Sequence, residues 1–155
     1  MDYWSLAVFG LANFAAACSG AFFKPDAWYF ALRKPSWQPP GWLFAPAWTI
    51  LYGMNAAAGW RVWEAAGPGE ATLPMAVYAV QLVANALWSA LFFGMRRMDL
   101  AFVDVIALWL TVAATMAVFH PVDPLAAWLL IPYLLWVSFA GLLNLTVWRL
   151  NREAA

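Results

Sequence analysis

Charged residues divide the chain into five long apolar segments. The stretches free of charge cover positions 3–23, 35–60, 71–95, 105–122 and 124–148, and the shortest is 18 residues long. A helix needs about 20 apolar residues to cross the hydrocarbon core of a bilayer. These segments are rich in Ala and Leu and lack the alternation expected of a strand. The pattern predicts transmembrane helices near Tyr3–Phe23, Leu43–Val62, Leu73–Met95, Leu100–Phe119 and Leu125–Trp148.

The composition supports a membrane protein made of one domain, residues 1–155. The sequence is 66% hydrophobic and 10% charged, whereas soluble domains carry about 25% charged residues. Its formal net charge is zero, which gives no basic field for a nucleic acid partner. The single cysteine, Cys18, permits no internal disulfide, and no metal-ligand cluster is visible. The expected fold class is an all-α membrane protein, a five-transmembrane-helix bundle surrounded by membrane lipid.

Basic residues gather in the segments that five spans place on one side of the membrane. Seven of the eight lie there, and only Arg61 lies on the opposite side. Because cytoplasmic loops are enriched in Lys and Arg, we expect the N-terminus outside and the C-terminus in the cytoplasm. The seven residues are Lys24, Arg33, Lys34, Arg96, Arg97, Arg149 and Arg152.

The longest predicted loop, residues 24–42, ends in the run 34–42, which contains three prolines and the tryptophans Trp37 and Trp42. Proline fixes φ and removes backbone donors, so the run 34–42 is expected to be neither helix nor sheet. One interpretation is a loop that folds back over the mouth of the bundle and caps a pocket. The other is a stiff connector held at the membrane interface by its tryptophans.

Polar residues are sparse within the predicted spans, and most share a helix face with a tryptophan. An interior lined by indoles and amides suits a large, flat, apolar ligand, although the same groups also serve to join helices. Asp104, near the start of its helix, is expected to favour the helix dipole and to pair with Arg96 or Arg97. The polar residues are Asn13, Asn55, Gln81, Asn85 and Asn144, beside Trp48, Trp88 and Trp136.

Small residues recur at four-residue spacing in the first and third predicted helices. This spacing allows close helix approach, so we expect a homodimer whose seam uses the third helix, the first, or both. The two series are Ala12, Ala16 and Gly20, and Ala86, Ala90 and Gly94.

Several motifs together resemble the translocator protein family, also called tryptophan-rich sensory proteins or peripheral-type benzodiazepine receptors. The resemblance covers nearly the whole chain, in order and with matching spacing. The most specific motif is W-x-P-P-x-W within Lys34–Trp42. The others are Pro46–Tyr52, Gln81–Leu82, Asn85–Trp88, Phe92–Gly94, Ala101–Asp104, Pro132–Trp136 and Val147–Arg149.

The resemblance implies a receptor or translocator-like protein that binds tetrapyrroles such as protoporphyrin IX or haem, and sterol-like lipids, with no required cofactor. Its role would lie in tetrapyrrole trafficking or stress sensing. The ligand site would lie under the first loop, with Trp37 and Trp42 above it. The other implied site residues are Phe44, Ala45, Ala47, Trp48, Asn85, Trp88, Leu100, Val103, Ala107, Trp136, Ala140 and Leu143.

The resemblance also raises an enzyme-like alternative. Tyr29, Trp48 and Trp136 match aromatic residues tied in the family to light-dependent porphyrin breakdown. We favour binding over turnover, because no proton-handling group accompanies these residues in the sequence.

The end of the fifth predicted helix departs from part of the family. The sterol motif proposed for some relatives needs a tyrosine where this chain has Leu145. This difference favours a bacterial-type porphyrin binder in the bacterial cell membrane. A eukaryotic member would be expected in the mitochondrial outer membrane.

The charge pattern yields a test of topology. A reporter active only in the cytoplasm should be active when fused after Ala155 and silent when fused after Glu70, because the two positions lie on opposite sides of a five-span protein. The reverse result would contradict the predicted orientation.

Overall fold

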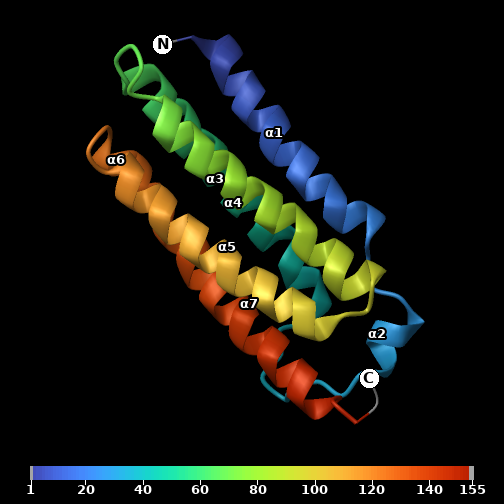
Figure 1. Cartoon of the computed structure of the whole chain (residues 1–155). Helices are drawn as coiled ribbons and strands as arrows, with labels where there is room; N and C mark the ends of the chain where they lie inside the picture. The colour runs from blue at the N-terminus through green and yellow to red at the C-terminus, as the bar shows by residue number, and fades with distance from the viewer. Residues whose placement is uncertain (1, 154–155) are drawn as a thin grey trace.

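The computed structural model describes residues 2–153, and every regular element among them is a helix. Five long helical columns run side by side (Figure 1), which confirms the predicted all-helical membrane fold. The columns are α1 (Tyr3–Phe22), α3 (Phe44–Ala65), α4 (Thr72–Ser89) continued by the π-helix η2 (Ala90–Gly94), α5 (Met98–Phe119), and α6 (Pro124–Leu129) continued by α7 (Ile131–Leu150). The short elements are α2 (Ala27–Ala31) and the 3₁₀ turn η1 (Gly41–Leu43).

Four of the columns are long and apolar enough to cross a bilayer, judged by length and composition alone: Tyr3–Phe22, Thr72–Gly94, Met98–Phe119 and Pro124–Leu150. The fifth, α3, has the 22-residue length of α5 but carries Arg61 and Glu64 near its end. It packs against α1, α4 and α6 within the same bundle.

The helix ends differ from the sequence-based expectation in three places. Residues 27–31 of the expected loop form α2, because the Asp26 carboxylate accepts the Tyr29 N–H and caps the turn. Gly41–Leu43 also forms a 3₁₀ turn at the end of the proline-rich run. The last column is interrupted at Leu130, since Pro132 fits only the first turn of a helix and begins α7 there.

One hydrogen-bonded network joins α1, α3 and α4 at the middle of the bundle. Asn55 Nδ2 donates to Asn13 Oδ1 (2.7 Å), and Gln81 Nε2 donates to Asn55 Oδ1 (3.1 Å). Asn13 Nδ2 donates to the Tyr78 hydroxyl (2.7 Å), which donates to the Asn55 carbonyl (3.0 Å). All four side chains are almost fully buried. In hydrocarbon such groups must be satisfied by protein, so the network fixes how these helices lie together.

The small residues of α1 and α4 face each other inside one chain. The Ser19 hydroxyl donates to the Ala86 carbonyl, and a Cβ placed on Gly20 would lie 3.9 Å from Ser89 Oγ. At Gly94 a Cβ would meet the Phe23 ring at 2.7 Å. Close packing of α1 against α4 therefore uses part of the small-residue series that the sequence assigns to a dimer seam.

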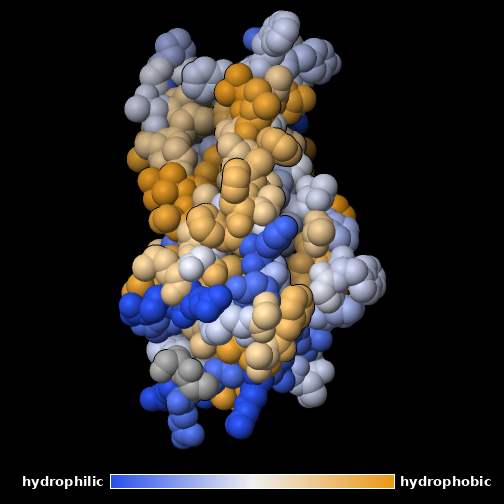
Figure 2. All heavy atoms as spheres, turned by 90° about the vertical axis from the view of Figure 1, so that its right-hand side faces the viewer, coloured by the Kyte–Doolittle hydropathy of each residue, from blue (hydrophilic) through white to orange (hydrophobic). Residues whose placement is uncertain are grey.

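The two ends of the bundle differ in charge. The seven basic residues named above lie in segments at the end with α2 and the C-terminus (Figure 1). Figure 2 shows that strongly hydrophilic side chains gather toward this end on the viewed face, with apolar surface beyond them. At the other end Arg61 pairs with Asp123 (2.8 Å). The fold thus separates the basic residues as expected, and which end faces the cytoplasm stays a prediction.

Candidate functional site

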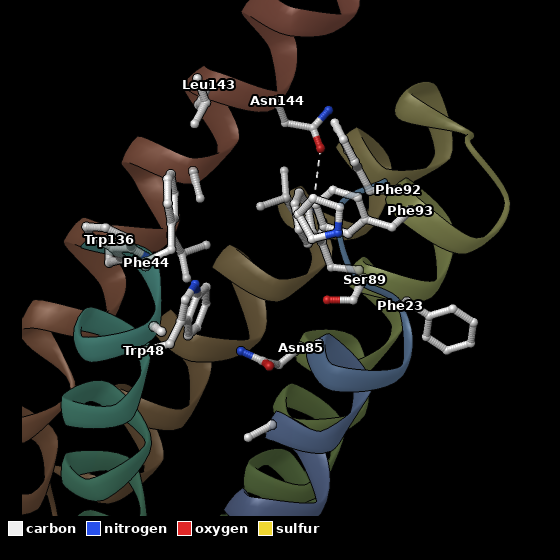
Figure 3. A pocket seen from close by; sticks show the side chains of 18 of the residues that line it. Phe23, Phe44, Trp48, Asn85, Ser89, Phe92, Phe93, Trp136, Leu143 and Asn144 are labelled. Carbon is white, nitrogen blue, oxygen red and sulfur yellow. Dashed lines mark hydrogen bonds between the residues drawn. The ribbon is translucent and has the colours of Figure 1, made fainter. Parts of the chain in front are cut away.

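A cavity of about 680 Å³ lies in the half of the bundle nearest α2. Its wall is formed by α1, the loop between α1 and α3, α3, α4 with η2, α5 and α7. Most of the lining is apolar and aromatic, with a few amide and hydroxyl groups (Figure 3). A cavity of this size and character is typical of sites for small apolar ligands, which run from about 300 to 1,000 Å³.

One aromatic wall is built by α3 and α7. Phe44 and Trp48 are one helical turn apart on α3, so both face the cavity. The Trp136 ring meets each of them edge-to-face, with centroid distances of 5.9 Å to Phe44 and 6.3 Å to Trp48. Figure 3 shows these three rings together on one side of the cavity.

A second aromatic wall is built by α4 and η2. Trp88 stacks on Phe92 with ring centroids 5.0 Å apart, and Phe93 lies edge-on to both. The neighbours Phe92 and Phe93 both line the cavity. The π-turn, in which Met95 N–H donates to the Ala90 carbonyl (2.8 Å), adds a residue to the turn and allows this. No sequence signal beyond the family motif points to this turn.

Hydrogen bonds from buried amides hold both walls in place. Trp88 Nε1 donates to Asn144 Oδ1 (2.9 Å), and Asn144 Nδ2 donates to the Met98 carbonyl (3.0 Å). Below the second wall, Asn85 Nδ2 donates to the Tyr133 hydroxyl (2.6 Å) and Asn85 Oδ1 accepts from the Tyr52 hydroxyl (2.5 Å). The amides near the cavity are therefore used to position helices and rings.

The loop between α1 and α3 covers the end of the cavity. Gln38 Nε2 donates to the Tyr29 hydroxyl (3.0 Å), and both residues line the cavity. Lys34 Nζ donates to the Tyr29 carbonyl (2.7 Å) and lies 4.5 Å from the centre of the Tyr29 ring. Partial burial raises the pKa of the Tyr29 phenol above its usual value. These contacts place Tyr29 and Gln38 of the loop at the end of the cavity, and that the loop caps a ligand site stays a prediction.

Two further attachments hold the loop. Asn151, at the end of α7, accepts the Arg33 N–H at Oδ1 (3.0 Å) and donates from Nδ2 to the Arg33 carbonyl (2.9 Å). Asp26 pairs with Arg96 (3.0 Å). The Tyr29 N–H, and to a lesser degree Arg96, lower the pKa of the Asp26 carboxyl.

The structure brings many of the residues implied by the resemblance to this cavity. Whether they bind a ligand stays a prediction, but their position fits that role. The residues that line it are Tyr29, Phe44, Ala45, Trp48, Asn85, Trp88, Trp136, Ala140 and Leu143. Those that do not are Trp37, Trp42, Ala47, Leu100, Val103 and Ala107.

The rotation of α5 about its axis and the path of the loop between α1 and α3 explain why Val103, Trp37 and Trp42 lie outside the cavity. On α5 the side chains that line it are Val105 and Leu108, whereas Val103 is 63% exposed on another face. Trp42 is 73% exposed, and Trp37 packs edge-on against Phe139 (5.9 Å). The two loop tryptophans thus lie outside the cavity.

Some cavity residues were not identified from sequence. Tyr52 lies one turn beyond Trp48, and the same four-residue spacing that joins Phe44 to Trp48 would have found it.

The expected ion pair of Asp104 is not formed, because Arg96 pairs with Asp26 and Arg97 with Asp99 (2.6 Å). Asp104 is buried, and within residues 2–153 its Oδ2 has no hydrogen-bond partner.

Comparison with known proteins shows extensive similarity. The profile of the TspO/MBR family matches residues 4–149. The chain is 46% identical over 151 residues to the tryptophan-rich sensory protein of Cereibacter sphaeroides, covering 97% of this chain and 94% of the relative. It is 44% identical over 151 residues to protein CrtK of Rhodobacter capsulatus, covering 95% and 94%. It is 42% identical over 126 residues to the translocator protein of Homo sapiens, covering 80% and 75%.

The attachment of the loop to α7 can be tested by hydrogen exchange. Replacing Asn151 with Ala removes the acceptor of the Arg33 N–H and the donor to the Arg33 carbonyl. Each net hydrogen bond contributes about 0.5–1.5 kcal/mol, so amide exchange in residues 24–42 should accelerate several-fold. Thr146→Val, on the same helix, is the control and should not change it. Equal protection of the loop in Asn151→Ala and the parent would contradict this attachment.

Proposed function

The chain belongs to the TspO/MBR family, and from that premise we propose that it binds porphyrins in the cavity between its two aromatic walls. It is a multi-pass integral membrane protein of the translocator and sensor class. Its proposed role is tetrapyrrole trafficking or stress sensing. We place it in the bacterial cell membrane with the C-terminus in the cytoplasm, supported by its bacterial relatives and by the basic end of the bundle.

The observation that carries this proposal is the pair of facing aromatic walls. Phe44, Trp48 and Trp136 lie on one side of the cavity, and Trp88 with Phe92 on the other (Figure 3). A flat conjugated ring between them would be contacted on both sides, and aromatic contacts stabilise by about 0.5–1.5 kcal/mol beyond area burial.

The basic residues of the loop favour a ligand that has anionic groups at the end of the cavity nearest this loop. The aromatic walls lie at membrane depth, while the loop above them contains Lys24, Arg33 and Lys34. The carboxylates of protoporphyrin IX or haem would therefore be placed toward basic residues, with the ring in the apolar cavity. A sterol-like lipid is a second proposed ligand class, because the lining is mainly apolar, although it would not use a tyrosine at position 145.

Light-dependent breakdown of protoporphyrin is the alternative function. The edge-to-face contact of Trp48 and Trp136 favours it, since both indoles would lie against one ligand. Against it, the cavity lining identified within residues 2–153 contains no Asp, Glu, His or Lys to move protons. We therefore place binding first.

Substitution of the two tryptophans tests the proposal. Trp48→Ala or Trp136→Ala should weaken protoporphyrin IX binding roughly tenfold or more, because a stacked contact is lost and a void is left. Trp→Phe at either position should keep most of the affinity, since the face of a ring remains. Tryptophan-fluorescence quenching during a porphyrin titration measures both.

The controls are Trp4 and Trp63, which are 83% and 50% exposed at the end of the bundle far from the cavity. Phe at either position should change neither binding nor breakdown. If breakdown occurs under light, Trp48→Phe and Trp136→Phe should bind but lose it, because phenyl is harder to oxidise than indole. Unchanged affinity in folded, monodisperse Trp48→Ala and Trp136→Ala proteins would remove the cavity as the binding site.

We propose in addition that two copies of the chain form a homodimer through α4, α1 or both. Ala90, the first residue of η2, lies in the small-residue series that runs from α4 into η2 and is only half-buried in the single chain. Ala90→Leu should lower the yield of cross-linked dimer in mild detergent if α4 forms the seam. Ala12→Leu provides the same test for α1, and unchanged yields in both variants would exclude the small-residue seam.

A further inference from the structure

Nearly every Ser and Thr hydroxyl within the long helices has a hydrogen-bond acceptor in the protein. The usual acceptor is the carbonyl one turn earlier, as for Thr49 with Ala45 (2.8 Å) and Thr146 with Leu142 (2.8 Å). The lipid core provides no water for such groups. The paired hydroxyls are Ser5, Ser19, Thr49, Thr111, Thr115, Ser138 and Thr146.

Ser89 is the exception in the interior of these helices. Its hydroxyl makes no hydrogen bond to any residue in the described range 2–153, and Ser89 lines the cavity. Figure 3 shows the Ser89 oxygen directed into the cavity, toward the side on which Trp48 lies. The carbonyl of Ala86, three residues earlier, accepts the Ser19 hydroxyl instead. Ser89 is also the last residue before the π-turn of η2.

The amides and the other aliphatic hydroxyl near the aromatic walls are already paired, whereas the indole N–H groups of Trp48 and Trp136 make no hydrogen bond within residues 2–153. Asn85 binds Tyr52 and Tyr133, and Asn144 binds Trp88 and the Met98 carbonyl. Thr49 donates to its own helix. Among the hydroxyl and amide groups between the walls, the Ser89 hydroxyl is therefore the donor that a ligand can engage without breaking an existing bond, and it lies on the wall opposite the two indole N–H groups.

We propose that the Ser89 hydroxyl donates a hydrogen bond to an oxygen or nitrogen acceptor on the ligand ring, and that it selects such ligands over hydrocarbons of the same shape. The proposal rests on the proposed function, because it requires a flat ligand between the aromatic walls. A ligand without an acceptor would leave the hydroxyl unpaired in a dry site, which is unfavourable. Sites with a dedicated polar group reject analogues that lack its partner.

A matched pair of flat probes tests the selectivity. Pyrene has no acceptor, whereas 1-pyrenecarboxaldehyde adds one carbonyl to the same ring system. Each is titrated into purified protein in detergent, and the ratio of the two Kd values is compared between variants, so that partition into micelles cancels. The variants are Ser89→Ala, which removes the donor, Ser89→Thr, which keeps it, and Thr146→Val, which removes a paired hydroxyl outside the cavity.

The parent should prefer the aldehyde, and Ser89→Ala should lower that preference about fivefold, the size of one net hydrogen bond. Affinity for pyrene should stay within about twofold of the parent. Ser89→Thr and Thr146→Val should keep the preference.

Equal changes for both probes in Ser89→Ala would show a structural effect and overturn the proposal, as would an unchanged ratio. If the parent binds both probes and protoporphyrin IX but Ser89→Ala keeps the ratio, only the Ser89 assignment fails. If the parent binds none of the three, the proposed function fails and the Ser89 assignment falls with it.

Discussion

The hydrogen bonds of Asn55 are the interaction on which the rest of the structure depends. Its amide joins Asn13 of α1 to Gln81 of α4, and water is not available at this depth to replace either partner. Measured side-chain hydrogen bonds in membranes average only about 0.6 kcal/mol, so the effect is to fix position more than to add stability. Beyond this network the helices pack closely, as at Gly59, where a Cβ would lie 2.8 Å from the Phe9 and Tyr78 rings. Toward α2 the helices pack less closely, and the cavity lies between them there.

That arrangement explains why the cavity is aromatic and weakly polar. The amides that hold the helices together bond mainly to protein groups, so the surface left to a ligand is formed by aromatic rings, the indole N–H groups of Trp48 and Trp136, and the Ser89 hydroxyl. The loop above the cavity is held by Tyr29, Lys34 and Asn151 at the basic end of the bundle. An apolar cavity between the long helices, with a basic and hydrogen-bonded loop at its end, suits an amphiphilic ring better than an ion or a fully polar solute, in line with the proposed function.

The sequence predicted the parts of this structure that depend on composition and on regular helical spacing. The charge-free segments predicted the five columns, and the family resemblance implied Phe44, Trp48 and Trp136, which form one aromatic wall. The sequence did not predict α2, because a five-residue helix depends on the Asp26 cap and not on hydrophobic period. It missed the π-turn that presents Phe92 and Phe93, which depends on the local backbone path. It also did not separate Val103 from Val105 on α5, because a helix that is apolar all round shows no preferred face.

Occupancy of the cavity by a flat ring is the central claim, and filling the cavity tests it most directly. Ala140 lines the wall on α7 beside Trp136. Equilibrium titration of protoporphyrin IX should give saturable binding of one molecule per chain in the parent. Ala140→Phe, in folded protein of unchanged thermal stability, should weaken that binding by about tenfold or more, since the added ring occupies the space of the ligand. Equal affinity and stoichiometry in the filled variant would contradict the account and place the ligand elsewhere.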